Sequence, residues 1–213
     1  MKILAIESHG DDLELSAGGT IARFCQEKHE VYVNIVATSN YSSYDGTILR
    51  SIEESTSESI EGLMVLGVKK NNIQNLGFKT KKIPFNYILI EAINKNIDKI
   101  RPDLIMTHHL NDSHPDHINT GKATLAAARY YNTIWMYEPI YPSKLSNVGF
   151  RAIKYVNISN YLKTKIAALK KHQSQWKKYA YWEDLVTSLA RIRGIEIKTQ
   201  YAEAFDIIKE ELR

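Results

Sequence analysis

Residues 3–14 read ILAIESHGDDLE, a short apolar run followed directly by a cluster of ionisable side chains. The apolar residues 3–6 are too few for a helix, which favours a buried strand. If that strand is parallel to its neighbours, its polar continuation lies at the carboxyl edge of a sheet, where open α/β folds bind their ligands. The stretch therefore predicts a strand that ends in a functional site.

His9 and Asp12 carry a ring nitrogen and a carboxylate, two of the ligand types that zinc accepts. A catalytic zinc site needs three protein ligands and one open position, so a third ligand must come from elsewhere. Residues 107–117, THHLNDSHPDH, hold four of the chain's seven histidines and two aspartates. A second buried strand is predicted over residues 103–107, and it would bring these side chains to the same sheet edge.

The composition limits the class of protein. A chain of 213 residues with 44% hydrophobic residues predicts a single domain over residues 1–213. The net charge of +4 is not gathered into a dense run of Lys and Arg, so no nucleic-acid partner is expected. Cys25 is the only cysteine, which favours a reducing compartment, and we expect a cytoplasmic protein. No signal-peptide pattern and no window of about 18 apolar residues is present, so no membrane partner is expected.

Strands are also predicted over residues 31–37 and 72–78, and they alternate with helices. The helices are predicted over residues 16–28, 49–66, 85–100 and 161–175, with another that begins at Pro115. The apolar spacing places Ile52 and Ile88 on the buried sides of their helices. This alternation predicts an α/β fold, a Rossmann-like three-layer sandwich with a mostly parallel central sheet and helices on both faces. Residues 139–149, with two prolines and a glycine, are expected to link the last sheet elements to a helical end.

Several features have two interpretations. Gly18 and Gly19 indicate a close approach of the backbone to another group, either a packed neighbour or a ligand. They do not form the G-x-G-x-x-G pattern, which disfavours a dinucleotide site. Residues 38–47 are predicted to be a loop at the site edge, either a cover for substrate or a solvated connection. The aromatic residues of the stretch 176–182 are expected in core packing or a subunit contact rather than in sugar stacking.

Two short motifs carry a family resemblance. Residues 8–14, SHGDDLE, with GGT at 18–20, are similar to the A-H-P-D-D-x-E and G-G-T signature of the LmbE/PIG-L de-N-acetylases. Residues 114–117, HPDH, resemble the second signature of that family. Further similar segments are LGV at 66–68, KKHQSQ at 170–175, RG at 193–194 and YAEAF at 201–205. The resemblance thus extends over most of the chain.

The resemblance implies a role for each of six residues. The metal ligands would be His9, Asp12 and His117. Asp11 would be the general base, and His114 would stabilise the oxyanion or protonate the leaving amine. Asp116 would hold an imidazole in orientation, as carboxylates near metal sites commonly do. His172 and Gln175 are either an ordinary polar helix end or residues near the active site.

The implied activity is a zinc-dependent amidohydrolase that removes an N-acetyl or other N-acyl group from a small amino-sugar molecule, such as an N-acetylglucosamine conjugate. Zinc, or another divalent metal such as Fe²⁺, would activate water and polarise the carbonyl. The alternative is a noncatalytic metal- or sugar-binding domain that retains the fold. Such a domain needs neither Asp11 nor His114, which favours the enzyme. The oligomeric state stays open, a homo-oligomer included.

The chain departs from the family pattern at two positions. Gly10 stands where proline is usual, and glycine can adopt the proline conformation, so the metal site is expected to survive. Ser55 stands where relatives often have arginine, three residues before Glu58, and Arg50 is a candidate to replace that arginine. Between the two signatures, His108, His109 and Asp112 either supply a ligand in place of His117 or hydrogen-bond the wall of the site, and we favour the wall.

Overall fold

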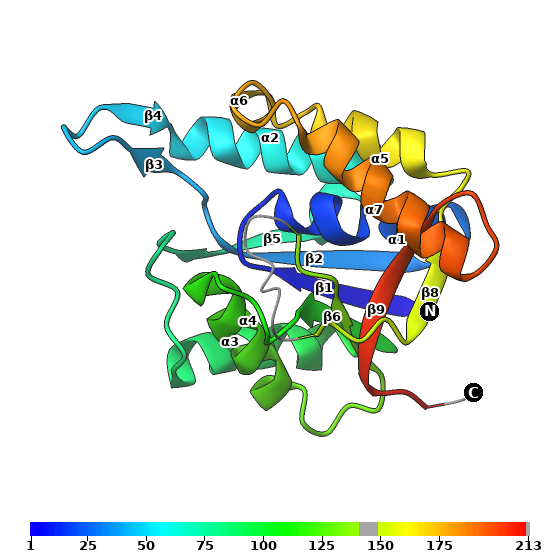
Figure 1. Ribbon diagram of the computed structural model, residues 1–213. Coiled ribbons are helices and arrows are strands. Elements are labelled where there is room, and N and C mark those ends of the chain that lie inside the picture. The colour runs from blue at the N-terminus through cyan, green and yellow to red at the C-terminus, as the bar shows by residue number, and fades with distance from the viewer. Residues whose placement is uncertain (141–148, 212–213) are drawn as a thin grey trace.

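The first element of the computed structural model is β1 (Lys2–Glu7), an inner strand of a seven-stranded sheet (Figure 1). The structure describes residues 1–140 and 149–211, so most of the predicted linker lies outside the described residues. Within them the strand order is β5-β2-β1-β6-β7-β9-β8. The other strands of this sheet are β2 (Glu30–Ala37), β5 (Ile73–Phe78), β6 (Leu104–His108), β7 (Ile134–Tyr137), β8 (Lys154–Asn157) and β9 (Ala202–Lys209).

The pairing is mostly parallel. β1 pairs in parallel with β2 and β6, β2 with β5, and β6 with β7. Only β9 runs against its neighbours, β7 and β8. Because β1 and β6 are adjacent and parallel, the residues that follow them emerge at the same carboxyl edge, as the sequence predicts.

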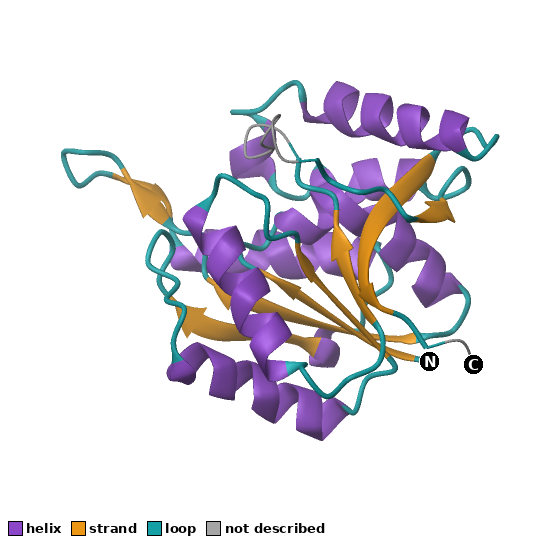
Figure 2. Ribbon diagram, turned by 60° about the horizontal axis from the view of Figure 1, so that its bottom comes forward, coloured by secondary structure: helices purple, strands orange, loops and turns teal. Residues whose placement is uncertain are grey.

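Helices cover both faces of the sheet, which confirms the predicted three-layer α/β architecture (Figures 1 and 2). One face carries α1 (Asp12–Gln26), α2 (Ile52–Val65), α5 (Leu162–Leu169), α6 (Gln173–Trp176) and α7 (Trp182–Glu196). The other face carries α3 (Tyr87–Ile100) and α4 (Pro115–Ala127). A 3₁₀ turn, η1 (Lys70–Asn72), precedes β5. No helix among the described residues is long and apolar enough to span a bilayer.

The side chains of β1 alternate between two hydrophobic cores. Ile3 and Ala5 pack with α1 on one face, and Leu4 and Ile6 pack with α3 and α4 on the other. All four are fully buried, because a parallel strand between helical layers has no solvent face. This explains why residues 3–6 of the strand are all apolar.

Four predicted helices differ from those in the structure. α1 begins at Asp12, four residues before the predicted start. Its first turn contains Asp12 and Glu14, and acidic side chains are favourable at the positive N-terminal end of a helix. The predicted burial of Ile52 and Ile88 is wrong, since they are 50% and 68% exposed in the first turns of α2 and α3. The predicted helix 161–175 is interrupted at residues 170–172, between α5 and α6.

The predicted strand set is incomplete. A small antiparallel hairpin, β3 (Tyr41–Ser42) and β4 (Ile48–Arg50), forms in the segment predicted as loop and helix start, and it projects from the body in both views (Figures 1 and 2). The expectation that the sheet ends before the linker is wrong, because β8 and β9 follow it and complete the sheet. The C-terminal part of the chain therefore belongs to the same sheet as the N-terminal part.

The structure gives a packing reason for Gly18 and Gly19. A Cβ at Gly19 would lie 2.7 Å from Ile158 Cδ1, and one at Gly18 would lie 3.1 Å from Lys165 Cγ. Neither glycine lines the large cavity described below. The close approach is therefore between α1 and both α5 and the residues just before it, and not between α1 and a ligand.

Replacing Gly19 by alanine is expected to destabilise the protein by about 1–3 kcal/mol, the usual cost of overpacking a core. The added methyl would overlap three atoms of the Ile158 side chain at 2.7–2.9 Å. Urea unfolding followed by circular dichroism measures the change in the free energy of unfolding. Gly149→Ala is the control, because no atom of the described residues lies within 4 Å of a Cβ there. Equal stability of the two variants would contradict the packing explanation.

Candidate active site

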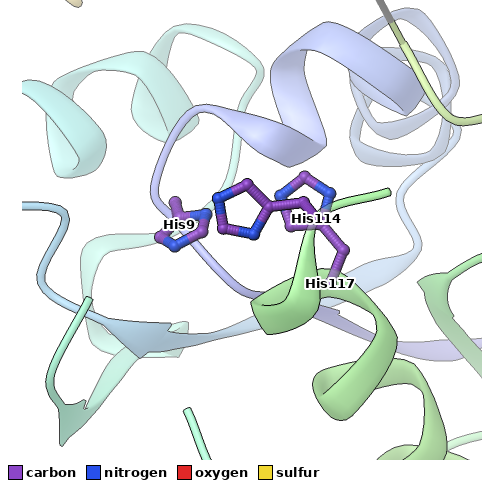
Figure 3. A group of neighbouring side chains, drawn as sticks. All are labelled: His9, His114 and His117. Atoms are coloured by element: carbon purple, nitrogen blue, oxygen red, sulfur yellow. The ribbon is translucent and has the colours of Figure 1, made fainter. Parts of the chain in front are cut away.

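A cavity of about 370 Å³ opens at the carboxyl edge of the sheet, where the loops after β1 and β6 meet. Five of the six predicted site residues line it, namely His9, Asp11, Asp12, His114 and His117. The sixth, Asp116, lies behind His9 and is 2% exposed. The loop after β1 supplies the first residues, and the start of α4 supplies the histidine rings at 114 and 117 (Figure 3).

His9 is held by two carboxylates. Its Nε2 lies 3.0 Å from Asp116 Oδ2, and its Nδ1 lies 3.3 Å from Asp12 Oδ2. Asp116 also accepts hydrogen bonds from the backbone N–H groups of Lys81, at 2.6 Å, and Ile83, at 3.1 Å. Since a carboxylate only accepts, Nε2 carries the proton in this contact. The neutral ring therefore offers the lone pair of Nδ1 to the cavity.

His117 is held in the same way, with its two nitrogens exchanged. Its Nδ1 donates to Asp112 Oδ2 at 2.9 Å, and its Nε2 lies 3.3 Å from Asp12 Oδ1. The neutral ring thus offers the lone pair of Nε2. Asp112 also accepts from the His114 N–H at 2.8 Å, which shapes the turn before α4. The role of Asp112 as the partner of His117 was missed in the sequence, although its place in the site wall was expected.

Asp12 lies between these two rings, in the first turn of α1. Its Oδ2 accepts from the His9 N–H at 2.8 Å, which fixes the carboxylate to the loop that carries His9. Burial alone would raise the pKa of Asp12, but the charges of His117 and His9 hold that pKa well below its usual range. A fully ionised, buried carboxylate between two imidazoles is a strong site for a cation.

His114 is oriented for donation rather than for metal binding. It is the N-cap residue of α4, and its Nδ1 accepts from the Asp116 N–H at 3.2 Å. Burial, with the nearby charges of His117 and His9, lowers the pKa of His114, so the ring is neutral at pH 7. A neutral ring whose Nδ1 accepts carries its proton on Nε2.

His108 and His109 belong to the wall of the site. His108 Nε2 accepts from the Ser8 N–H at 2.9 Å, and burial lowers the pKa of His108 to about 4. His109 Nε2 lies 3.3 Å from Asp206 Oδ2, on β9. The His108 nitrogen nearest Asp12 is Nε2, and its lone pair already accepts the Ser8 N–H.

Among the described residues, two groups of three have ligand atoms within 4.8 Å of one another. They are His9, His114 and His117, and Asp12, His108 and His117. The hydrogen bonds distinguish ligands from non-ligands within these groups. His114 Nδ1 accepts a hydrogen bond, so its Nε2 carries the proton and cannot bind a metal. His108 Nε2 already accepts the Ser8 N–H. When both rings are neutral, the atoms with free lone pairs are His9 Nδ1, His117 Nε2 and the carboxylate oxygens of Asp12.

Asp11 is the N-cap residue of α1, directly before Asp12 in the chain. It lines the cavity, is partly buried, and its carboxylate forms no hydrogen bond within residues 1–140 and 149–211. A carboxylate without a donor keeps its full capacity to accept a proton from a bound water.

The departure at Gly10 has a packing reason. A Cβ at this position would overlap the Ser59 side chain, lying 2.6 Å from its Cβ. The Gly10 N–H also donates to Ser39 Oγ at 3.2 Å, a bond that proline lacks. Glycine and Ser59 therefore fit each other, and the loop still brings His9 and Asp12 together.

The departure at Ser55 is matched by an arginine from another element. Arg50, at the end of β4, is 2% exposed and its Nη2 lies 2.8 Å from Glu58 Oε2. It also lines the cavity. Glu58 in turn accepts from the backbone N–H and the hydroxyl of Ser174, at 2.7 and 2.6 Å. An Arg–Glu pair is therefore present at this wall, with the guanidinium supplied by the hairpin.

The C-terminal wall contains residues that the sequence did not assign to the site. Tyr179, Tyr181 and Trp182 line the cavity, although Trp182 also packs into a small core with Leu169 and Val186. The expected role in packing is thus only part of their role. Gln175 lines the cavity as well, whereas His172 is fully buried outside it, with its Nε2 3.1 Å from Glu14 Oε1.

Metal binding at pH 7 is expected to release close to two protons. Burial lowers the pKa of each histidine, but Asp12 and the bonds to Asp116 and Asp112 outweigh it and raise the pKa of His9 to about 9 and that of His117 to about 10. Both rings are therefore protonated in the metal-free protein and must lose a proton to coordinate.

Titration calorimetry of the metal-free protein with zinc, in buffers of different ionisation enthalpy, counts these protons. The number should fall as the pH approaches 10, and the affinity for the metal should rise over the same range. Absence of proton release at pH 7 would contradict the expected protonation of the two rings.

The sequence is similar to a known family and to two known deacetylases. Residues 4–128 match the PIG-L family, described as GlcNAc-PI de-N-acetylase. The chain is 26% identical over 227 residues to the diacetylchitobiose deacetylase of Thermococcus kodakarensis, covering 97% of this chain and 83% of the relative. It is 32% identical over 178 residues to the uncharacterized deacetylase YaiS of Escherichia coli, covering 81% and 90%.

The fold is also similar to a solved structure. The N,N'-diacetylchitobiose deacetylase of Pyrococcus horikoshii, in complex with an inhibitor, superposes with a TM-score of 0.83 at 22% identity. The match covers 97% of this chain and 83% of that one. The likeness supports the α/β architecture and extends over β8 and β9.

Proposed function

The chain belongs to the PIG-L family of GlcNAc-PI de-N-acetylases, and we propose that it is a metal-dependent hydrolase that removes the N-acetyl group of a small amino-sugar conjugate. The observation that carries the proposal is the hydrogen-bond pattern around Asp12. Once His9 and His117 lose a proton, it leaves three free ligand atoms beside the Asp11 carboxylate, which accepts no hydrogen bond within the described residues, and one imidazole N–H donor.

The residues present fit a divalent cation. His9, Asp12 and His117 would hold it, with Asp116 and Asp112 fixing the two rings. Two nitrogens and one carboxylate are a donor set typical of catalytic zinc, and Fe²⁺ accepts the same set. When bound, the metal supplies a polarised carbonyl and a water of lowered pKa. The electrostatic cost of the buried Asp12 carboxylate is then offset by a cation.

Two side chains would move the protons of the reaction. Asp11 would take a proton from the attacking water, because its carboxylate faces the cavity without a competing donor. His114 would donate its Nε2–H to the developing oxyanion and then to the leaving amine. Its lowered pKa keeps the ring neutral, so it acts as a hydrogen-bond donor before it acts as an acid.

The substrate class rests on the relatives and on the cavity. Relatives of this chain are deacetylases of diacetylchitobiose, a molecule of acetylated amino sugars. A volume of about 370 Å³ has room for a sugar ring with a small attached group, and aromatic faces such as Tyr179 suit sugar rings. The alternative, a noncatalytic binding domain, leaves the placement of Asp11 and His114 unexplained.

Acetate release from a panel of N-acetylglucosamine conjugates tests this function. The purified protein would be assayed with zinc, with Fe²⁺ under anaerobic conditions, and after chelation. Release that depends on the metal is the expected result, and formyl and longer acyl analogues would define the acyl group. Well-metallated protein that binds the conjugates but releases no acid from any of them would support the noncatalytic alternative.

A further inference from the structure

A chain of hydrogen bonds runs along the wall that the hairpin and α6 contribute to the active-site cavity. Its centre is Glu58 on α2, whose Oε2 accepts from Arg50 Nη2 at 2.8 Å and from the Ser174 hydroxyl at 2.6 Å. Burial alone would raise the pKa of Glu58, but the bonds from Ser174 and Arg50 lower that pKa, so the carboxylate is ionised at pH 7. The charges of Arg50 and Glu58 therefore cancel within the wall.

The next bond of the chain fixes the orientation of the Gln175 amide. A hydroxyl has one proton to donate, and Ser174 Oγ donates that proton to Glu58. Ser174 Oγ can therefore only accept from Gln175, whose Nε2 lies 3.3 Å away. Gln175 Nε2 also donates to the hydroxyl oxygen of Tyr41 at 3.3 Å. Both N–H groups of the amide are thus used within the wall.

The carbonyl end of the same amide stays open. Gln175 lines the cavity, and its side chain is otherwise buried. Its Oε1 accepts no hydrogen bond from residues 1–140 and 149–211, although it is not enclosed by protein atoms. Polar atoms of a largely buried side chain normally have a partner, so this oxygen is an acceptor for a molecule bound in the cavity.

The Tyr41 hydroxyl complements this acceptor. Tyr41 lies in β3 and lines the cavity, and its oxygen accepts from Gln175 Nε2. Its own proton has no acceptor in the described part of the chain. The ring is held by the Lys178 ammonium group, which lies 4.9 Å from the ring centroid. The wall therefore presents one O–H donor and one carbonyl acceptor, which a single amide group holds next to each other.

We propose that Tyr41 and Gln175 bind two adjacent hydroxyl groups of the sugar ring, one accepting the Tyr41 proton and the other donating to Gln175 Oε1. The proposal rests on the proposed function and deepens it. An N-acetylglucosamine unit joined to its conjugate through the anomeric carbon has one pair of adjacent free hydroxyls, the 3- and 4-hydroxyls. Each hydroxyl can both donate and accept, so this pair matches the two groups of the wall. Arg50, Glu58 and Ser174 hold the two contacting groups in place.

The test compares the methyl glycoside of N-acetylglucosamine with its 3-deoxy, 4-deoxy and 6-deoxy analogues, using the zinc-loaded protein. kcat/KM should fall about tenfold for the 3-deoxy and for the 4-deoxy analogue, because each leaves one polar group of the wall without its partner. It should be unchanged for the 6-deoxy analogue, in which the adjacent hydroxyls are intact. Any other pattern among the four glycosides would overturn the proposal.

Variants assign the two contacts to the two side chains. Tyr41→Phe removes the hydroxyl and keeps the ring that Lys178 contacts. It should lower kcat/KM for the methyl glycoside about tenfold and should abolish the discrimination against one of the two deoxy analogues, the one that lacks the partner of Tyr41. Gln175→Met should abolish the discrimination against the other analogue. Losses that are equal for all four glycosides would show that the two side chains only shape the wall, and would overturn the contacts.

Tyr44→Phe and Gln173→Met are the matched controls. Tyr44 is exposed in the turn of the same hairpin, Gln173 is exposed at the start of α6, and both lie outside the cavity lining. Both controls should keep the activity and the discrimination of the unaltered protein. Losses in the controls that match those of Tyr41→Phe and Gln175→Met would overturn the assignment.

The outcomes separate this proposal from the proposed function. If the glycosides are hydrolysed without discrimination, the deacetylase stands and the hydroxyl contacts fail. If none is hydrolysed, the proposed function fails for these glycosides, and their binding to the zinc-loaded protein, followed by NMR titration, decides the contacts. Weaker binding of the 3-deoxy and 4-deoxy analogues, abolished as a difference in Tyr41→Phe and Gln175→Met, would support the contacts. Equal binding of the four glycosides, or no binding, would overturn them.

Discussion

Replacing Asp11 by asparagine is expected to lower kcat by about 10²- to 10⁴-fold, the range that a positioned general base contributes. Asparagine has nearly the same shape but cannot take a proton from water. Asp11 makes no side-chain hydrogen bond in the described part of the chain, so the change should leave the fold and the metal site intact. Steady-state kinetics on an N-acetylated substrate and metal content by mass spectrometry measure the two effects together.

Asp98→Asn is the matched control for this variant, because Asp98 is exposed on α3 and outside the active-site cavity. It should retain full activity. A variant at Asp11 that keeps its metal and its turnover would show that another group accepts the proton. Loss of both metal and turnover would instead place Asp11 among the groups that hold the metal.

Replacing Asp12 by asparagine is expected to abolish turnover through loss of the metal. Among residues 1–140 and 149–211, the Asp12 carboxylate is the only carboxylate that lies within 3.3 Å of both His9 and His117. Removing its charge should lower metal affinity by more than about 100-fold, the upper range for losing an outer hydrogen-bond partner of a metal ligand. Zinc affinity from competition with a chromophoric chelator gives the value directly.

His109→Asn is the control for Asp12→Asn. His109 also lines the cavity, but it faces Asp206 and belongs to neither group of possible ligands. The control should bind zinc as the unaltered protein does. Zinc affinity unchanged in Asp12→Asn would mean that the metal is held by His9, His114 and His117 instead.

The centre of the fold and much of the site were predictable because their signals are local. The apolar run before Glu7 is short and ends in ionisable residues, so both the strand and its functional end are visible in one window. His114 and His117 share a helix start marked by Pro115, which fixes their spacing. The structure brings all of these side chains to one cavity.

The strands at the far side of the sheet were not predictable from periodicity. β9 contains two buried acidic residues, Glu203 and Asp206, which interrupt any apolar pattern. Each is buried because of a partner distant in sequence. Glu203 accepts from Lys165 Nζ at 2.6 Å and from two N–H groups of α1, and Asp206 lies against His109.

The site residues that were missed depend on tertiary geometry. Asp112 meets His117 only because the turn before α4 folds back. Arg50, by contrast, was named as a candidate, and it reaches Glu58 because a hairpin stands where a helix start was predicted. Lys81 reaches the cavity through a left-handed residue held by Asp116, and no local sequence pattern encodes that bond.

The most direct test of the central claim is a zinc titration of the chelated protein in the presence of an N-acetylglucosamine conjugate. The account predicts that acetate release rises linearly with zinc to one equivalent per chain and that it falls to background in Asp12→Asn. Acetate release that survives complete removal of metal would contradict the metal-dependent mechanism. A chain that binds one equivalent of zinc without releasing acetate from any conjugate would contradict the proposed deacetylase activity.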